Sequence, residues 1–96
     1  MADPSDTQKP QQIQINTIDE MSRGKYANNM IVTHSSEEFM MDWLLNAPNG
    51  SHLVARVIVS PGHLKRIIQA LTTNLNNYEQ KFGKVKIVEP TDQKFH

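Results

Sequence analysis

Apolar and polar positions are patterned most clearly between residues 54 and 83, where strand-forming residues lead directly into a long amphipathic segment. Ser60 suits an N-cap, Pro61 suits the first helical position, and Gly83 suits a helix stop. Between them, apolar side chains recur at steps of three and four at Leu64, Ile67, Ile68, Leu71, Leu75, Tyr78 and Phe82. The pattern predicts a buried strand followed by a helix of about 22 residues, roughly 33 Å long, with one apolar stripe.

Two segments nearer the amino terminus have the pattern of strands. Residues 12–17 alternate polar side chains with Ile13 and Ile15, which is typical of a half-buried strand, and we expect an edge strand here. After a polar link that contains Gly24, residues 26–35 are rich in β-forming side chains and predict a second strand.

Residues 36–46 fit two structures. A capping box formed by Ser35 and Glu38 favours a helix, as do the apolar pairs spaced four apart in this segment. The turn chemistry of Pro-Asn-Gly at 48–50 favours a strand instead, because it folds the chain back into a hairpin. We prefer the hairpin and keep the helix as the alternative.

The hairpin has a register that pairs complementary side chains. When the paired residue numbers sum to 98, Asp42 faces Arg56 and Trp43 faces Ala55, so opposite charges meet and the largest side chain meets a small one. The apolar pairs in this register are Met40–Ile58, Met41–Val57, Leu44–Val54 and Leu45–Leu53. A slip by one residue would lose the charge match, so this register is preferred.

This hairpin has two apolar faces, and a single helix covers only one of them. The first face consists of Phe39, Met41, Trp43, Leu45, Leu53, Ala55, Val57 and Val59. We expect the following helix to pack on it. The second face carries Met40, Leu44, Val54 and Ile58 around the pair of Asp42 and Arg56. Because an uncovered apolar patch is typical of an interaction surface, these four residues are the predicted contact with a second copy or another polypeptide.

The fold class predicted from these elements is α+β, a three- or four-stranded antiparallel β-meander packed by one long C-terminal α-helix. Residues 12–88 form the single predicted domain. Residues 1–11 and 89–96 are polar and poor in apolar side chains, so we expect disordered tails at both ends.

Composition narrows the function. Ten Lys and Arg residues balance ten Asp and Glu residues, and this neutral balance argues against nucleic acid as the main partner. The 96-residue chain has no cysteine, which excludes disulfides, thiolate metal sites and cysteine catalysis. There is neither an apolar run long enough to cross a membrane nor a signal-peptide pattern, so we expect a cytoplasmic protein without a membrane partner.

The predicted elements resemble a known family. The likeness lies in the stretches YANNMIVTHSSEEFMMDWLL and HLVARVIVSPGHLKRIIQALTTNLNNYEQKFG, within residues 26–83. They resemble the small bacterial and archaeal family catalogued as domain of unknown function 3467. One departure is Trp43, where phenylalanine is expected more often, a change of bulk rather than of chemistry. Because this family has no assigned activity, the resemblance implies no site residues.

Few residues point to specific chemistry. An anion held at the helix N-terminus would explain Lys65 and Arg66, and with Ser60 and His63 they form a candidate anion-binding site. The alternative is that both cations are simply solvated, which the lack of a Gly-rich loop favours. The histidines have no metal-ligand spacing and the serines have no base in a known motif, so we expect no metal, no cofactor and no catalysis.

These patterns favour an oligomeric interaction module, either adaptor-like or chaperone-like, rather than an enzyme. It would form a homodimer or higher oligomer and receive another polypeptide on its second sheet face or at an edge strand. The plan of a sheet leading through a Ser-Pro turn into a helix is also similar to that of the export chaperone SecB. The alternative is a nucleic-acid-binding regulator that uses the basic residues Lys65, Arg66, Lys81, Lys84 and Lys86.

Overall fold

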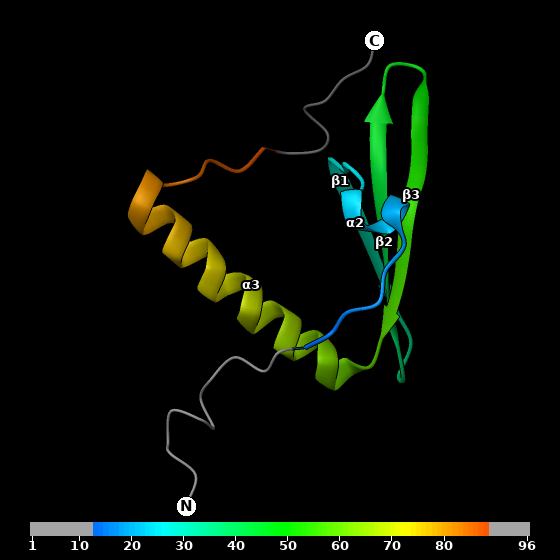
Figure 1. Ribbon diagram of the computed structural model, residues 1–96, viewed down its shortest axis with the longest axis horizontal. Coiled ribbons are helices and arrows are strands. Elements are labelled where there is room, and N and C mark those ends of the chain that lie inside the picture. Colours follow the sequence, from blue (N-terminus) through cyan, green and yellow to red (C-terminus); the bar gives the residue numbers. More distant parts are fainter. Residues whose placement is uncertain (1–12, 89–96) are drawn as a thin grey trace, which may run out of the picture.

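The computed structural model describes residues 13–88, and the tails predicted at 1–11 and 89–96 lie outside them. The described elements are, in order, α2 (Asp19–Arg23), β1 (Asn29–His34), β2 (Phe39–Ala47), β3 (Gly50–Val59) and α3 (Pro61–Phe82). The strands form one antiparallel sheet in the order β1-β2-β3, and α3 follows its last strand (Figure 1). The predicted α+β class, a β-meander before a long helix, is confirmed.

The edge strand predicted at residues 12–17 is wrong for the part that the structure describes. Residues 13–18 have no regular structure, and Ile13 and Ile15 are 71% and 78% exposed. Alternation favours a strand only where a sheet edge lies beside it and completes a hydrogen-bond ladder. Here the segment leads into α2 instead, and its isoleucines gain little burial.

Helix α2 occupies the polar link, for which the sequence predicted no regular structure. Asp19 and Arg23 are four residues apart, and their Oδ2 and Nη2 atoms lie 2.7 Å apart. Asp19 also stands in the first turn, where the helix dipole favours a negative charge. Gly24 follows with a φ of 76°, a conformation that favours glycine. The spacing of Asp19 and Arg23 is the feature of the sequence that could have predicted α2.

Side-chain groups hold both ends of the β1–β2 pair. Asn28 Nδ2 donates to the Asn46 carbonyl at 3.0 Å, and Asn28 Oδ1 accepts from the Asn46 amide at 2.8 Å. At the other end, Ser35 Oγ accepts from the amides of Glu37 and Glu38 at 3.2 and 3.3 Å. The Ser35–Glu38 spacing therefore stabilises a turn between strands, and it does not cap a helix.

The β2–β3 hairpin is confirmed, together with its register over the half that is farther from the turn. Pairing runs as predicted from Phe39 to Trp43, with Asp42 opposite Arg56 and Trp43 opposite Ala55. The helical alternative for residues 36–46 is wrong.

Nearer the turn, the pairing departs from the prediction, because Leu44 lies opposite Leu53 and not opposite Val54. The predicted register required a three-residue loop, whereas the chain closes with only two residues between Ala47 and Gly50. The strand absorbs the remaining residue as a β-bulge at Val54. All pairs between the bulge and the turn are shifted by one residue for the same reason.

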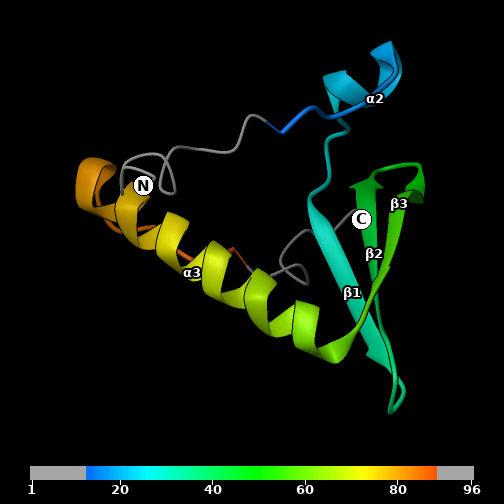
Figure 2. The same cartoon turned by 60° about the horizontal axis from the view of Figure 1, so that its bottom comes forward.

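Helix α3 has the predicted bounds, but the packing expected between this helix and the sheet does not occur within the chain. None of its residues is buried, and the helix diverges from the sheet in both views (Figure 1, Figure 2). The physical reason is the junction. Ser60 alone joins β3 to α3, which is shorter than the connections of about two to six residues that commonly let a helix return to its sheet.

The described part of the chain consequently has almost no core. Met41, at 7% exposure, is the one buried residue within 13–88. The extensive contacts between elements are those between paired strands. Small sheets need a packed apolar face for independent stability, so the uncovered apolar surfaces are the feature that any functional account must explain.

Candidate interaction surface

The side of the sheet that carries Trp43, here called the Trp43 face, is apolar along nearly all of its length. Cross-strand partners share a face, so the register places on it Met30, Val32, His34, Phe39, Met41, Trp43, Leu45, Ala47, Gly50, His52, Ala55, Val57 and Val59. His34 and His52 are its polar members, and the His34 ring stacks on that of Phe39 with centroids 5.0 Å apart. Val32, Trp43 and Val57 are 43%, 36% and 44% exposed, so this face is open.

The opposite side, here called the Asp42 face, holds a charged pair among apolar residues. Its members are Asn29, Ile31, Thr33, Met40, Asp42, Leu44, Asn46, Ser51, Leu53, Arg56 and Ile58. Three of the predicted contact residues, Met40, Leu44 and Ile58, lie together on this face. Ile31 and Leu53 join them through the observed register and are 51% and 54% exposed.

Asp42 and Arg56 form a bidentate ion pair at the centre of the Asp42 face. Arg56 Nε and Nη2 donate to Asp42 Oδ1 and Oδ2 at 2.7 and 3.0 Å. The hydrogen bond from Arg56 lowers the pKa of the Asp42 carboxyl, and the same contact raises the pKa of the guanidinium. A partner on this face must therefore accommodate fixed charges as well as apolar side chains.

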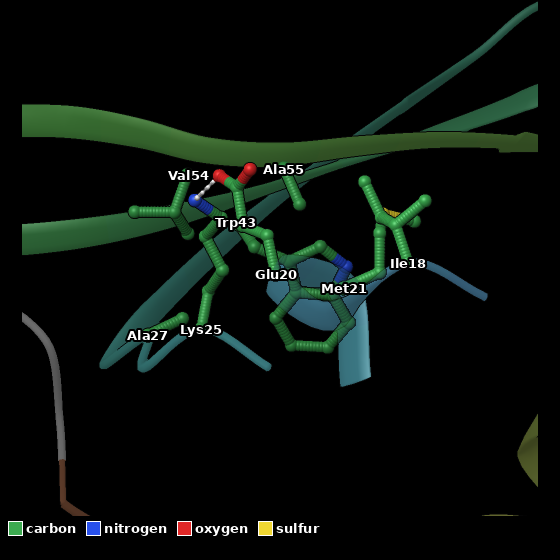
Figure 3. A pocket seen from close by; sticks show the side chains of 8 residues that line it. All are labelled: Ile18, Glu20, Met21, Lys25, Ala27, Trp43, Val54 and Ala55. Carbon is green, nitrogen blue, oxygen red and sulfur yellow. Dashed lines mark ion pairs between the residues drawn. The ribbon is translucent and has the colours of Figure 1, made fainter. Parts of the chain in front are cut away.

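A pocket of about 590 Å³ lies between α2 and the Trp43 face, and sequence reasoning missed it. Figure 3 shows the lining residues Ile18, Glu20, Met21, Lys25, Ala27, Trp43, Val54 and Ala55. Its lining is mostly apolar and includes one ion pair, with Glu20 Oε2 and Lys25 Nζ 3.5 Å apart. Because Ile18 and Met21 are themselves 62% and 71% exposed, the pocket is an open groove.

Val54 belongs to this pocket, which corrects its predicted placement with Met40, Leu44 and Ile58. A β-bulge sets two consecutive residues against one residue of the partner strand, so strict alternation fails there. Val54 and Ala55 accordingly line the same pocket as Trp43. Neither α2 nor the bulge follows from apolar periodicity, which explains why the pocket was not predicted.

Helix α3 presents its predicted apolar stripe to solvent. The exposed fractions lie between 49% and 64% for Ile68, Leu71, Leu75, Tyr78 and Phe82. The rings of Tyr78 and Phe82 lie 4.9 Å apart and make a contiguous apolar surface at the end of the stripe. The polar side is rich in Asn and Thr, which are weak helix formers, so the helix depends on packing of its stripe.

The candidate anion site at the start of α3 is assembled only in part. Ser60 Oγ accepts from the His63 amide at 3.2 Å, and the Ser60 carbonyl accepts from the Leu64 amide at 2.9 Å. Two of the three amides in this first turn are therefore engaged by the chain itself, which leaves less for an anion. Lys65 and Arg66 are exposed on the helix, and their role stays a prediction.

Other polar groups have local roles. His52 Nε2 lies 3.3 Å from Asn49 Oδ1 beside the hairpin turn, and Lys81 Nζ lies 5.5 Å from the centroid of the Phe82 ring. Within residues 13–88, no cluster of three or more His, Asp or Glu side chains is placed to hold a metal ion. In that same part of the chain, no helix has the length and apolar character needed to cross a membrane.

Comparison with known proteins supports the resemblance seen in the sequence. The model of a family described as "Protein of unknown function (DUF3467)" matches residues 1–87. The match includes the stretches within 26–83 and extends to the amino terminus. No curated protein and no solved structure matches the chain.

Proposed function

We propose a non-catalytic role for this chain, which belongs to the DUF3467 family. In this proposal it is a cytoplasmic interaction module that assembles with itself and then binds another polypeptide. The role follows from surfaces rather than from reactive groups, because apolar side chains are gathered on the two sheet faces and on the stripe of α3.

The observation that carries the proposal is the lack of burial around those surfaces. Met41 is the one buried residue in the described chain, whereas monomeric proteins rarely expose contiguous apolar patches larger than a few hundred Å². Burial of apolar surface contributes about 25 cal/mol per Å² and is the main favourable term in folding. Association supplies this burial, so self-assembly is part of folding in this account.

The polypeptide-binding part of the proposal is supported by strand β1 and the Asp42 face. Strand β1 is an edge of the sheet, and its sequence NMIVTH contains no Lys, Pro or Gly of the kind that often protects an edge. A partner in extended conformation would add to β1 through backbone hydrogen bonds. The apolar side chains of this partner strand would lie next to Ile31 on the Asp42 face, on the same side of the sheet as the pair of Asp42 and Arg56.

Sedimentation equilibrium at several salt concentrations tests this function against nucleic-acid binding. We expect an assembly at tens of micromolar that persists between about 0.1 and 1 M NaCl, because apolar association is not weakened by screening. Binding of a nucleic acid through Lys65 and Arg66 would instead weaken steeply as salt rises. A single 11.0 kDa species throughout would contradict the proposed self-assembly.

A further inference from the structure

We propose that a second copy completes the fold by helix exchange, so that the stripe of α3 from each copy packs on the Trp43 face of the other. This inference rests on the proposed self-assembly and names the surfaces that form it. It is supported by the junction between β3 and α3, by the match between the two surfaces, and by the area that they offer.

The junction keeps the two apolar surfaces apart within one chain. Ser60 is extended, with φ −73° and ψ 159°, and Pro61 begins the helix directly after it. Proline fixes its own φ and restricts the preceding residue to extended backbone, so the junction has little freedom to bend. The helix therefore points away from its own sheet (Figure 2), which leaves its stripe free for another copy.

The stripe and the Trp43 face match in length and in polarity. Helix α3 has 22 residues and extends about 33 Å, while the nine residues of β2 and ten of β3 extend about 30 Å. Neither the stripe nor the strand positions of the Trp43 face contribute an Asp, Glu, Lys or Arg side chain, and the Glu20–Lys25 pair lies beside Trp43 and Ala55 in the pocket under α2. The opposite face fits a helix less well, because the pair of Asp42 and Arg56 would have to leave water.

The exposed side chains offer enough area for a stable dimer. Those on the stripe and the Trp43 face that are 36% to 64% exposed are Ile68, Leu71, Leu75, Tyr78, Phe82, Met30, Val32, Trp43 and Val57. At roughly 150–250 Å² for a large side chain, they hold about 800 Å² of open surface per copy. A stable interface buries about 800 Å² per partner. Reciprocal exchange gives a two-fold dimer in which each copy supplies both surfaces.

The lack of cysteine and the single tryptophan allow a direct test. A nitroxide spin label is attached to Thr72→Cys, a position beside the stripe, in copies that carry no isotope label. These copies are mixed with isotope-labelled copies of the natural sequence, and the mixture is unfolded and refolded so that the two kinds of copy pair. Paramagnetic broadening in the labelled copies then reports only the helix of the other copy. With the spin-labelled copies in about fourfold excess, so that most isotope-labelled copies have a spin-labelled partner, we expect the Trp43 indole N–H signal to lose more than half of its intensity, and the Ile58 methyl signals to lose much less.

The alternative outcomes are distinguishable. A dimer whose broadening is confined to α3, or is greater at Ile58 than at Trp43, would overturn helix exchange and leave self-assembly intact. A protein that stays monomeric at these concentrations would overturn both proposals.

A matched pair of substitutions on α3 gives a second test. Leu75→Asp lies on the stripe and Thr73→Asp lies on the opposite side of the helix, and each adds one negative charge. We expect Leu75→Asp to weaken dimerisation by at least about a hundredfold and Thr73→Asp by less than about threefold. Equal dissociation constants for the two variants, measured by sedimentation velocity, would overturn the proposed contact.

Discussion

The two faces of the sheet differ in what a partner would have to bury. On the Trp43 face, the paired positions are apolar except for His34 and His52 near its two ends, so contact there buries mainly carbon. On the Asp42 face, the same strands hold a bidentate ion pair among apolar side chains, and covering that pair carries a desolvation cost. The first face therefore suits a permanent contact that completes the fold, whereas the second suits a selective contact that can be released.

Val57 and Ile58 are neighbours on β3 that lie on opposite faces of the sheet, so the same substitution at each tests this difference. Val57 and Ile58 have similar exposed fractions, 44% and 53%. We expect Val57→Asp to prevent assembly and to lower the free energy of unfolding by several kcal/mol, because a carboxylate would be buried in the interface. Ile58→Asp should leave assembly intact. Sedimentation velocity and urea unfolding measure both effects, and dissociation by Ile58→Asp alone would move the permanent contact to the Asp42 face.

Leu71 tests whether the stripe is covered in the assembled protein. It is 61% exposed in the isolated chain, where truncation to alanine would have little effect. If another copy buries it, Leu71→Ala should lower the free energy of unfolding by about 2–5 kcal/mol, the usual cost of a buried leucine. Thr73→Ala on the polar side is the control, with an expected change within about 0.5 kcal/mol. Equal small effects would mean that the stripe stays exposed.

The ion pair of the Asp42 face predicts a dependence of stability on pH. Because Arg56 lowers the pKa of Asp42 in the folded protein, the pair stabilises the fold above the ordinary carboxyl pKa. This contribution is lost as pH falls through the lowered value, below about pH 4. Unfolding measured across this acid range should show a shallower loss of stability for Asp42→Asn than for the natural sequence. Identical slopes would indicate that the pair adds nothing to the stability of the fold.

The smallest expected effect is at the start of α3. Lys65 and Arg66 are exposed, so replacing both with alanine should change the free energy of unfolding by less than about 0.5 kcal/mol and should leave assembly unchanged. Isothermal titration with inorganic phosphate provides the matching ligand test. Phosphate binding that disappears in the double variant would instead establish the candidate anion site and would place a function outside both sheet faces.

Local chemistry explains which parts of the fold could be predicted. The caps at Ser60 and Gly83 and the spacing of the stripe were sufficient for α3. The charge match between Asp42 and Arg56 was sufficient to predict the register of the hairpin in the half farther from its turn. These features depend on residues close in sequence or directly paired, so periodicity and charge reveal them.

The remaining features depend on geometry that periodicity does not contain. A two-residue loop in place of a three-residue loop placed Val54 in a bulge, which moved it out of the predicted contact set. The apolar stripe was expected to pack on the chain's own sheet, and the structure instead leaves it exposed. The junction at Ser60 and Pro61 directs α3 away from its own sheet, and this effect on helix direction appears only in the structure.

The central claim is that this chain completes its core only by association, and the concentration dependence of thermal unfolding tests it most directly. Unfolding of an obligate dimer is coupled to dissociation, so the midpoint must rise with protein concentration. Between about 1 and 100 μM we expect the circular-dichroism midpoint to rise by several degrees, with Trp43 emission shifting to longer wavelength in the same transition. A midpoint that is sharp and independent of concentration would contradict the account, because it would show a stable core within one copy.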